Sequence, residues 1–482
     1  MKKKVTMVIA GLLLALPALA APPADPGADR PTYTSGSADQ VALEITAYND
    51  NLGLIKDQRK ATFGKGIVEL RFADVAAGID PATVFIRSLT DPVRLSVLEQ
   101  NYEYDLLNPK RLLDKYVGQE VKLYYRNYYT EREEFVTAKV LSNNDNNPVY
   151  QIGDEITFNH PGRIIFPKVP ENLISKPTLV WLLKNDQPKE QTIETTYLTS
   201  GIGWRADYVV VLNREDTAAG ITGWVTLDNK SGAAYRDAAL KLVAGDVHRV
   251  REREAQRDLM FKGRMVEAAA APQFREEAFF EYHLYTLERK TTLKDNSTKQ
   301  VTLLTAQQVP AHKEFRLYGA DHYYRGRYGE PEQKQKVGVF LEIVNSKESG
   351  MGMPLPKGIV RVYKYDREGS LQFTGEDTID HTPKDEKLKL KLGEAFDVVA
   401  TRKQTDWKKL ASDTYETALE IAIRNHKPED IMVRIVEPVP GDWKVLESSH
   451  RWVKTSASQM EFAVPVKKDG ETVVTYRVRM RF

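Results

Sequence analysis

The chain has 482 residues, of which 41% are hydrophobic and 28% are charged, and it contains no cysteine. This composition is typical of a globular protein with several domains, and it excludes disulfides, thiolate catalysis and cysteine-ligated metal sites. The formal net charge of +2 leaves no basic excess for nucleic acid, whose binding requires clustered positive charge.

Residues 1–20 have the features of a secretory signal peptide. Three lysines at positions 2–4 precede an apolar run from Val5 to Leu16, and Ala18-Leu19-Ala20 offers small side chains for cleavage before Ala21. The run is shorter than the ~20 residues that span a bilayer, so we expect no transmembrane segment in the mature chain. Removal of the three lysines lowers the basic count from 69 to 66, against 67 acidic residues. We therefore expect an exported, nearly neutral protein, periplasmic first and cell-surface or extracellular as alternatives.

Residues 21–40 are rich in Pro, Gly, Ala and Ser, and we expect a flexible linker there. Apolar residues then alternate with polar ones from Val41 onward, which predicts an N-terminal β domain over residues 41–118. This domain ends in a short helix, because Asn108 can cap it, Pro109 suits its first turn and Gly118 suits the position after its last turn.

Residues 119–184 contain four short predicted strands separated by Asn-, Pro- and Gly-rich turns. Strands this short predict a small β-barrel-like region. The four strands are Val121–Tyr125, Phe135–Leu141, Tyr150–Phe158 and Arg163–Phe166.

Residues 185–482 form a predicted β-sandwich region with a charged insertion at about 249–278. Asp469-Gly470 predicts a hairpin, since a type I′ turn needs positive φ at both central residues, with arms over 459–466 and 472–482. In the last strand Tyr476, Val478 and Met480 are expected to point inward. The predicted fold class is mainly β, with immunoglobulin-like antiparallel β-sandwich domains, the small barrel-like region and few short helices.

Long strings of this sequence resemble bacterial exported proteins of domain-of-unknown-function family 4139. The matching segments are Thr196–Leu212 (TYLTSGIGWRADYVVVL), Ile221–Val247, Phe280–Leu304 and Ile423–His450. The resemblance implies export and a β-rich architecture, but no catalytic residue. Some relatives carry a long coiled coil before the Gly203-Trp204 segment, whereas no heptad run precedes Thr178 in this chain.

Motifs of common enzyme classes are absent from the sequence: there is no H-E-x-x-H, G-x-S-x-G, Walker loop or G-x-G-x-x-G. His283, oriented by Glu281, is a candidate general base, and Asp246 with His248 is a candidate pair of metal ligands. Both sets have an ordinary structural interpretation, which we favour because neither has a third partner in the sequence. We therefore predict no metal site, no cofactor and no catalytic residue.

Tyrosine and arginine gather in a Gly-punctuated segment after residue 318, where Tyr323, Tyr324, Arg325 and Tyr328 are candidate contact residues. Tyr and Arg provide large stacking surfaces with polar ends, which suit protein or glycan partners. Burial against neighbouring strands is the equally weighted alternative.

The sequence thus predicts a non-enzymatic envelope protein that acts through protein or glycan contacts. One alternative is a hydrolase whose site assembles in three dimensions around His283 or His248. Another is an assembly or adhesion component. The oligomeric state and the ligand are left open.

Overall fold

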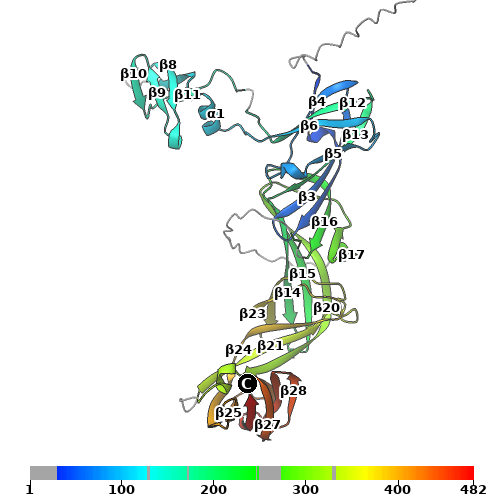
Figure 1. Ribbon diagram of the computed structural model, residues 1–482, viewed down its shortest axis with the longest axis vertical. Coiled ribbons are helices and arrows are strands. Elements are labelled where there is room, and N and C mark those ends of the chain that lie inside the picture. Colours follow the sequence, from blue (N-terminus) through cyan, green and yellow to red (C-terminus); the bar gives the residue numbers. More distant parts are fainter. Residues whose placement is uncertain (1–29, 127–130, 171–172, 246, 249–272, 328–332) are drawn as a thin grey trace, which may run out of the picture.

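The computed structural model describes residues 30–126, 131–170, 173–245, 247–248, 273–327 and 333–482, so the predicted signal peptide lies outside the described part. The described chain is mainly β, with antiparallel and mixed sheets, none of which closes into a barrel. None of the helices in these ranges has the length and hydropathy that a membrane crossing requires. Figure 1 shows an elongated molecule with β4 and β12 near one end and β27 and β28 at the other.

Two sheets build the N-terminal end. They are mixed, since β1 pairs with β4 and β2 with β16 in parallel. The four-stranded sheet has the order β1 (Thr32–Ser35), β4 (Gly66–Ala73), β12 (Thr178–Asn185) and β6 (Leu95–Glu103). The eight-stranded sheet has the order β17 (Phe274–Phe279), β18 (Tyr282–Leu287), β16 (Tyr235–Ala244), β2 (Gln40–Tyr48), β3 (Leu52–Thr62), β13 (Glu190–Thr199) and β5 (Phe85–Ser88), with β19 (Thr291–Leu293) beside β16.

These sheets differ from the predicted domain boundaries in two respects. Thr32–Ser35 lies inside the predicted flexible linker, yet it forms β1 because it pairs along β4. Strands β13 and β16–β19 follow residue 185, but they belong with β2, β3 and β5 in one sheet. Of the predicted charged insertion, residues 249–272 lie outside the described part and Phe274 already begins β17.

An insertion, residues 105–174, leaves the N-terminal sheets between β6 and β12 and has its own core. Its helix α1 (Pro109–Lys115) begins as predicted, because the Asn108 side chain accepts a hydrogen bond from the Arg111 N–H at 2.9 Å. The helix packs within the insertion and does not close the N-terminal domain. The sheet has the order β10 (Glu155–Phe158), β9 (Val149–Ile152), β8 (Glu133–Ser142), β7 (Glu120–Arg126) and β11 (Arg163–Ile165), without closing into the predicted barrel.

A thirteen-stranded sheet forms the rest of the molecule. Two of its strands are long and run from the middle of the molecule into its C-terminal end: β20 (Ser297–Tyr318) and β24 (Lys387–Lys409). The main path is β23 (Leu371–Ile379), β22 (Gly358–Tyr365), β14 (Ile202–Leu212), β15 (Ala218–Asn229), β20, β21 (Gln333–Val344), β24, β25 (Thr414–Asn425), β30 (Gly470–Arg481) and β27 (Asp442–Ser448). Off this path, β26 (Ile431–Pro438) pairs with β20 and β29 (Gln459–Val466), and β28 (Trp452–Ser456) pairs with β29.

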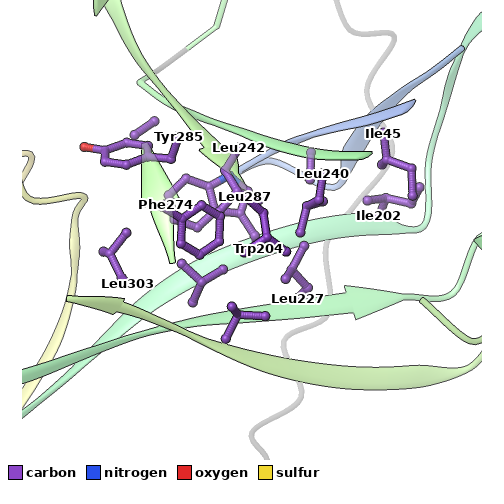
Figure 2. Packing of buried hydrophobic residues seen from close by; sticks show 14 of the residues in the cluster. Ile45, Ile202, Trp204, Leu227, Leu240, Leu242, Phe274, Tyr285, Leu287 and Leu303 are labelled. Carbon is purple, nitrogen blue, oxygen red and sulfur yellow. The ribbon is translucent and has the colours of Figure 1, made fainter. Parts of the chain in front are cut away.

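The largest core joins the N-terminal sheets to the middle of the molecule. Trp204 on β14 lies at 3% exposure among apolar side chains from β2, β15, β16, β17 and β18 (Figure 2). Its indole N–H donates to the Val243 carbonyl at 3.2 Å, so the polar end of the ring is satisfied within the core. Burial of this many aliphatic and aromatic side chains is the main force that holds the two regions together.

A second core defines the C-terminal unit, which we take as residues 315–327, 333–337 and 398–482. Tyr476, Val478 and Met480 point inward, as predicted, with 2%, 0% and 0% exposure. The predicted Asp469-Gly470 hairpin is wrong. Strand β29 pairs with β26 and β28, whereas β30 pairs with β25 and β27, so the turn connects two sets of strands that face each other across the core. Only Asp469 of the two turn residues has positive φ.

Candidate functional site

The predicted contact residues Tyr323 and Tyr324 lie in a 3-10 helix, η4 (Asp321–Tyr324), which covers part of the C-terminal core. Tyr323 is 6% and Tyr324 is 0% exposed. The Tyr323 hydroxyl donates to the Gln333 side chain at 3.0 Å and accepts from the Gln335 amide at 2.7 Å. Both rings are therefore part of the core, and neither offers a stacking surface to solvent.

Tyr324 belongs to a buried polar network that connects four elements of the C-terminal unit. Its hydroxyl donates to Glu437 Oε2 at 2.5 Å and shares a 2.7 Å hydrogen bond with the Tyr476 hydroxyl. Arg402 Nη2 donates to the other oxygen of Glu437 at 2.5 Å. Burial, reinforced by Glu437, raises the pKa of Tyr324 well above its usual value. The network consists of neutral phenols around one ion pair, which is an arrangement that fixes the core.

The other two predicted contact residues have different positions. Arg325 is exposed, and its guanidinium forms an ion pair with Asp321 one turn earlier. Tyr328 lies outside the described residues. In the described part of this segment, Arg325 is the predicted contact residue that solvent reaches.

His283 pairs with a different carboxylate from the one predicted. Phe280 and Glu281 form the turn between β17 and β18, so Glu281 is not on the strand of His283. Instead His283 Nδ1 lies 2.8 Å from Glu276 Oε1 on the neighbouring strand, and the imidazole side chain is 41% exposed. His248 is exposed, and its predicted partner Asp246 lies outside the described residues.

Neither of the two hollows that stand out in the structure contains these histidines. The first is an apolar cavity of about 10 Å³ among core residues such as Tyr208, Leu304 and Leu390, which is too small for a substrate. The second is an open recess of about 490 Å³ on the C-terminal unit. Among the described residues, no three His, Asp or Glu side chains are placed to hold a metal ion.

The open recess, called the 445–452 recess, lies where the chain crosses from β27 to β28 at one end of the molecule (Figure 1). Strand β27 is the last strand on one side of the C-terminal unit and β28 is the last on the other. The connection therefore spans the open side of the core. Its lining residues are Val445, Leu446, Glu447, Ser448, Ser449, His450, Arg451 and Trp452.

Two tryptophans explain why the chain takes this path. Trp443 on β27 is 8% exposed, and Trp452 at the start of β28 is half-buried, with ring centroids 5.8 Å apart. The Trp443 indole N–H donates to the Ala457 carbonyl at 2.7 Å. Pairing of the two rings closes the open side of the core from both strands.

Hydrogen bonds fix the turn between these strands. The Ser449 N–H donates to the Thr475 carbonyl at 2.8 Å, and the Ser449 hydroxyl accepts from the Thr475 N–H at 2.9 Å. The Ser449 hydroxyl also lies 2.9 Å from His450 Nδ1, and the Ser448 hydroxyl donates to the His450 carbonyl at 2.6 Å. These hydrogen bonds hold the backbone of the turn at Ser448 and Ser449 against β30 and His450.

The charged groups of the recess differ in how they are paired. Glu447 Oε2 lies 4.0 Å from Arg477 Nε on β30. Arg451 is exposed, and within the described ranges it forms no ion pair or hydrogen bond. A guanidinium group that has no partner among the described residues is equipped to hold an anionic group.

Sequence reasoning missed this recess, although a signal was present. The segment 442–452 (DWKVLESSHRW) places two tryptophans on either side of a Ser-Ser-His-Arg turn. The tryptophans could have been read as the ends of two edge strands. The pairing of those edges in different strand sets is a tertiary feature, which alternation along the chain does not reveal.

No protein-family model matches this chain, and no curated protein matches its sequence significantly. Its resemblance to family 4139 therefore stays a prediction.

Proposed function

We propose that the mature chain is a non-enzymatic, exported envelope protein that binds a glycan or protein partner through the 445–452 recess. The observation that carries the proposal is the recess itself, an open hollow of about 490 Å³ lined in part by Trp452 and by Arg451, which has no ion pair among the described residues. Export is supported by the leader-like residues 1–20.

The architecture of the molecule supports a binding function over catalysis. Strands β27 and β28, between which the recess lies, are at one end of the elongated molecule (Figure 1), and most of the lining residues are exposed. Ser448 and Ser449, which line the recess, are engaged with the backbone of the turn and of β30. We further propose that the C-terminal unit is an immunoglobulin-like sandwich and that the chain belongs to family 4139. The first is supported by two strand sets that share one core, and the second by the sequence strings given above.

Site-specific photo-crosslinking tests the proposal. A photoreactive side chain at Leu446, which is 37% exposed in the recess, is expected to capture envelope material from extracts of the producing cells. A matched probe is placed at Val93, which lies in the N-terminal region and is 89% exposed. It measures the nonspecific crosslinking of any exposed position. Adducts at Leu446 that are absent at Val93 support the proposal. No adduct at Leu446, or the same adducts at both positions, would refute it.

A further inference from the structure

We infer that the 445–452 recess takes a saccharide that carries a carboxylate, with Arg451 as the residue that binds the carboxylate. This inference rests on the proposed binding function and names its ligand class. It follows from three features: the charge left unpaired in the recess, the shape of the two strand edges beside it and the chemistry of its walls.

Arg451, which has no ion pair among the described residues, leaves a positive charge in the recess that favours an anionic ligand. Glu447, by contrast, has Arg477 at 4.0 Å. The guanidinium group presents a planar fork of N–H donors that matches a carboxylate in two parallel hydrogen bonds. A neutral sugar has no carboxylate to accept these hydrogen bonds, so the guanidinium group would remain hydrated. We therefore expect the site to distinguish ligands by charge.

The strand edges argue against a peptide as the ligand. An extended peptide binds best by adding a regular strand to a flat, open edge. Here β27 has a register shift between Val445 and Glu447, and β28 has another between Lys454 and Ser456. Bulges of this kind twist an edge and interrupt its hydrogen-bonding row. The recess must therefore bind through side chains and not through main-chain pairing.

The walls of the recess suit a sugar ring. Trp452 provides part of an indole, and Leu446 and Val445 add aliphatic surface. A pyranose presents C–H groups on its faces and hydroxyls at its rim, so it contacts apolar and polar groups at once. The turn is already fixed by the bonds of Ser449 to Thr475, so little ordering is required on binding.

Two sugars that differ by the relevant group provide the test. N-acetylmuramic acid carries a lactyl carboxylate on the ring of N-acetylglucosamine, and both can be titrated into the purified mature chain by calorimetry. We expect the acidic sugar to bind at least about tenfold more tightly, and its affinity to fall as salt is raised. Arg451→Gln should reduce the affinity for the acidic sugar to the affinity for the neutral one. Arg367→Gln, the same change at an exposed arginine in the turn between β22 and β23, should leave both affinities unchanged.

Equal affinities for the two sugars, or an unchanged preference in Arg451→Gln, would overturn the inference. If neither sugar binds while Leu446 still crosslinks to a protein, the ligand class is wrong and the binding function stands. If Leu446 captures nothing, the proposed function itself has failed.

Discussion

Two parts of the molecule, the insertion and the C-terminal unit, are attached to the rest in opposite ways. The insertion is connected to the N-terminal sheets by two chain segments, one after β6 and one before β12. Strands β6 and β12 pair with each other along β6 from Leu95 to Glu103. Beyond that ladder, a bridge between Leu106 and Ile174 joins the two connecting segments within the described residues. The C-terminal unit instead continues strands β20 and β24, whose first halves belong to the middle of the molecule.

The hydrophobic cores of these two parts also differ, in their size and in the charged groups that they contain. The insertion has a hydrophobic core of seven apolar or aromatic residues, among them Leu123 and Tyr116, and it also buries the polar Asn143, whose amide donates to Asp114. The C-terminal unit has a larger core that also contains the Arg402–Glu437 ion pair at 1% and 0% side-chain exposure. A unit that shares strands with its neighbour should unfold together with that neighbour. A unit that is joined to the rest by two connecting segments should unfold independently. The following predictions test this difference, and hydrogen exchange followed by mass spectrometry resolves the regions.

The largest effect is expected from a proline in the shared strand β24. Ala400 is fully buried and pairs with Gln335 on one side and Ile423 on the other. Ala400→Pro removes a ladder hydrogen bond in a central strand and should cost about 4 kcal/mol or more. Exchange should rise in the C-terminal unit and in the middle of the molecule, while α1 and β7–β11 keep their protection. Faster exchange confined to the C-terminal unit would show that the shared strands do not couple the regions.

The next largest effect is expected from the buried ion pair. Glu437→Gln leaves the Arg402 charge without its counterion in the core, which should lower the free energy of unfolding of the C-terminal unit by about 3–4 kcal/mol. The double variant Glu437→Leu with Arg402→Met removes both charges and should be less destabilised than the single variant. Thermal unfolding of all three proteins provides the comparison. A double variant as unstable as Glu437→Gln would mean that the pair itself, and not the uncompensated charge, stabilises the unit.

A smaller and strictly local effect is expected in the insertion. Leu123 on β7 is 0% exposed, and Leu123→Ala should cost about 2–3 kcal/mol through lost burial and the cavity left behind. In a core of seven residues this is enough to increase the exchange of residues 105–174 strongly, with the rest unaffected. The matched control is Thr137→Ala on β8, whose side chain is exposed. Faster exchange in β4 or β13 would show that the insertion is not independent.

Sequence patterns predicted local features well and long-range ones poorly, for physical reasons. The Asn108 cap and the inward face of Tyr476, Val478 and Met480 depend on neighbours within a few residues, and the structure confirms both. The Asp469-Gly470 turn was assigned to a hairpin because a tight turn looks alike whether its strands pair side by side or face each other across a core.

The candidate site shows the same limit. Tyr323 and Tyr324 lie in a Gly-flanked segment that resembles a loop, yet the core they cover comes from strands more than a hundred residues away, at Glu437 and Tyr476. Parallel pairings such as β20 with β26 also join distant segments, and a single sequence contains no local signal for them. The 445–452 recess exists only once those segments are assembled.

The smallest predicted effect is a titration at the surface of the C-terminal unit, where Asp406 meets Arg477 at 2.8 Å and Lys408 at 3.0 Å. Hydrogen bonds from Arg477 and then Lys408 lower the pKa of Asp406 to about 2. Because the pKa in the folded state is below that of the unfolded chain, the contribution of Asp406 to stability is complete above pH ~4 and is lost as the pH falls towards 2. Arg477→Gln should raise this pKa towards the ordinary aspartate value, while Arg481→Gln, whose partner is Asp413, should leave it in place. Carboxyl NMR of ¹³C-labelled aspartate, assigned with Asp406→Asn, measures the shift. An unchanged pKa in Arg477→Gln would mean that this ion pair between β24 and β30 is broken in solution, and that Arg479 with Glu416 is left as an ion pair that supports the β25–β30 ladder.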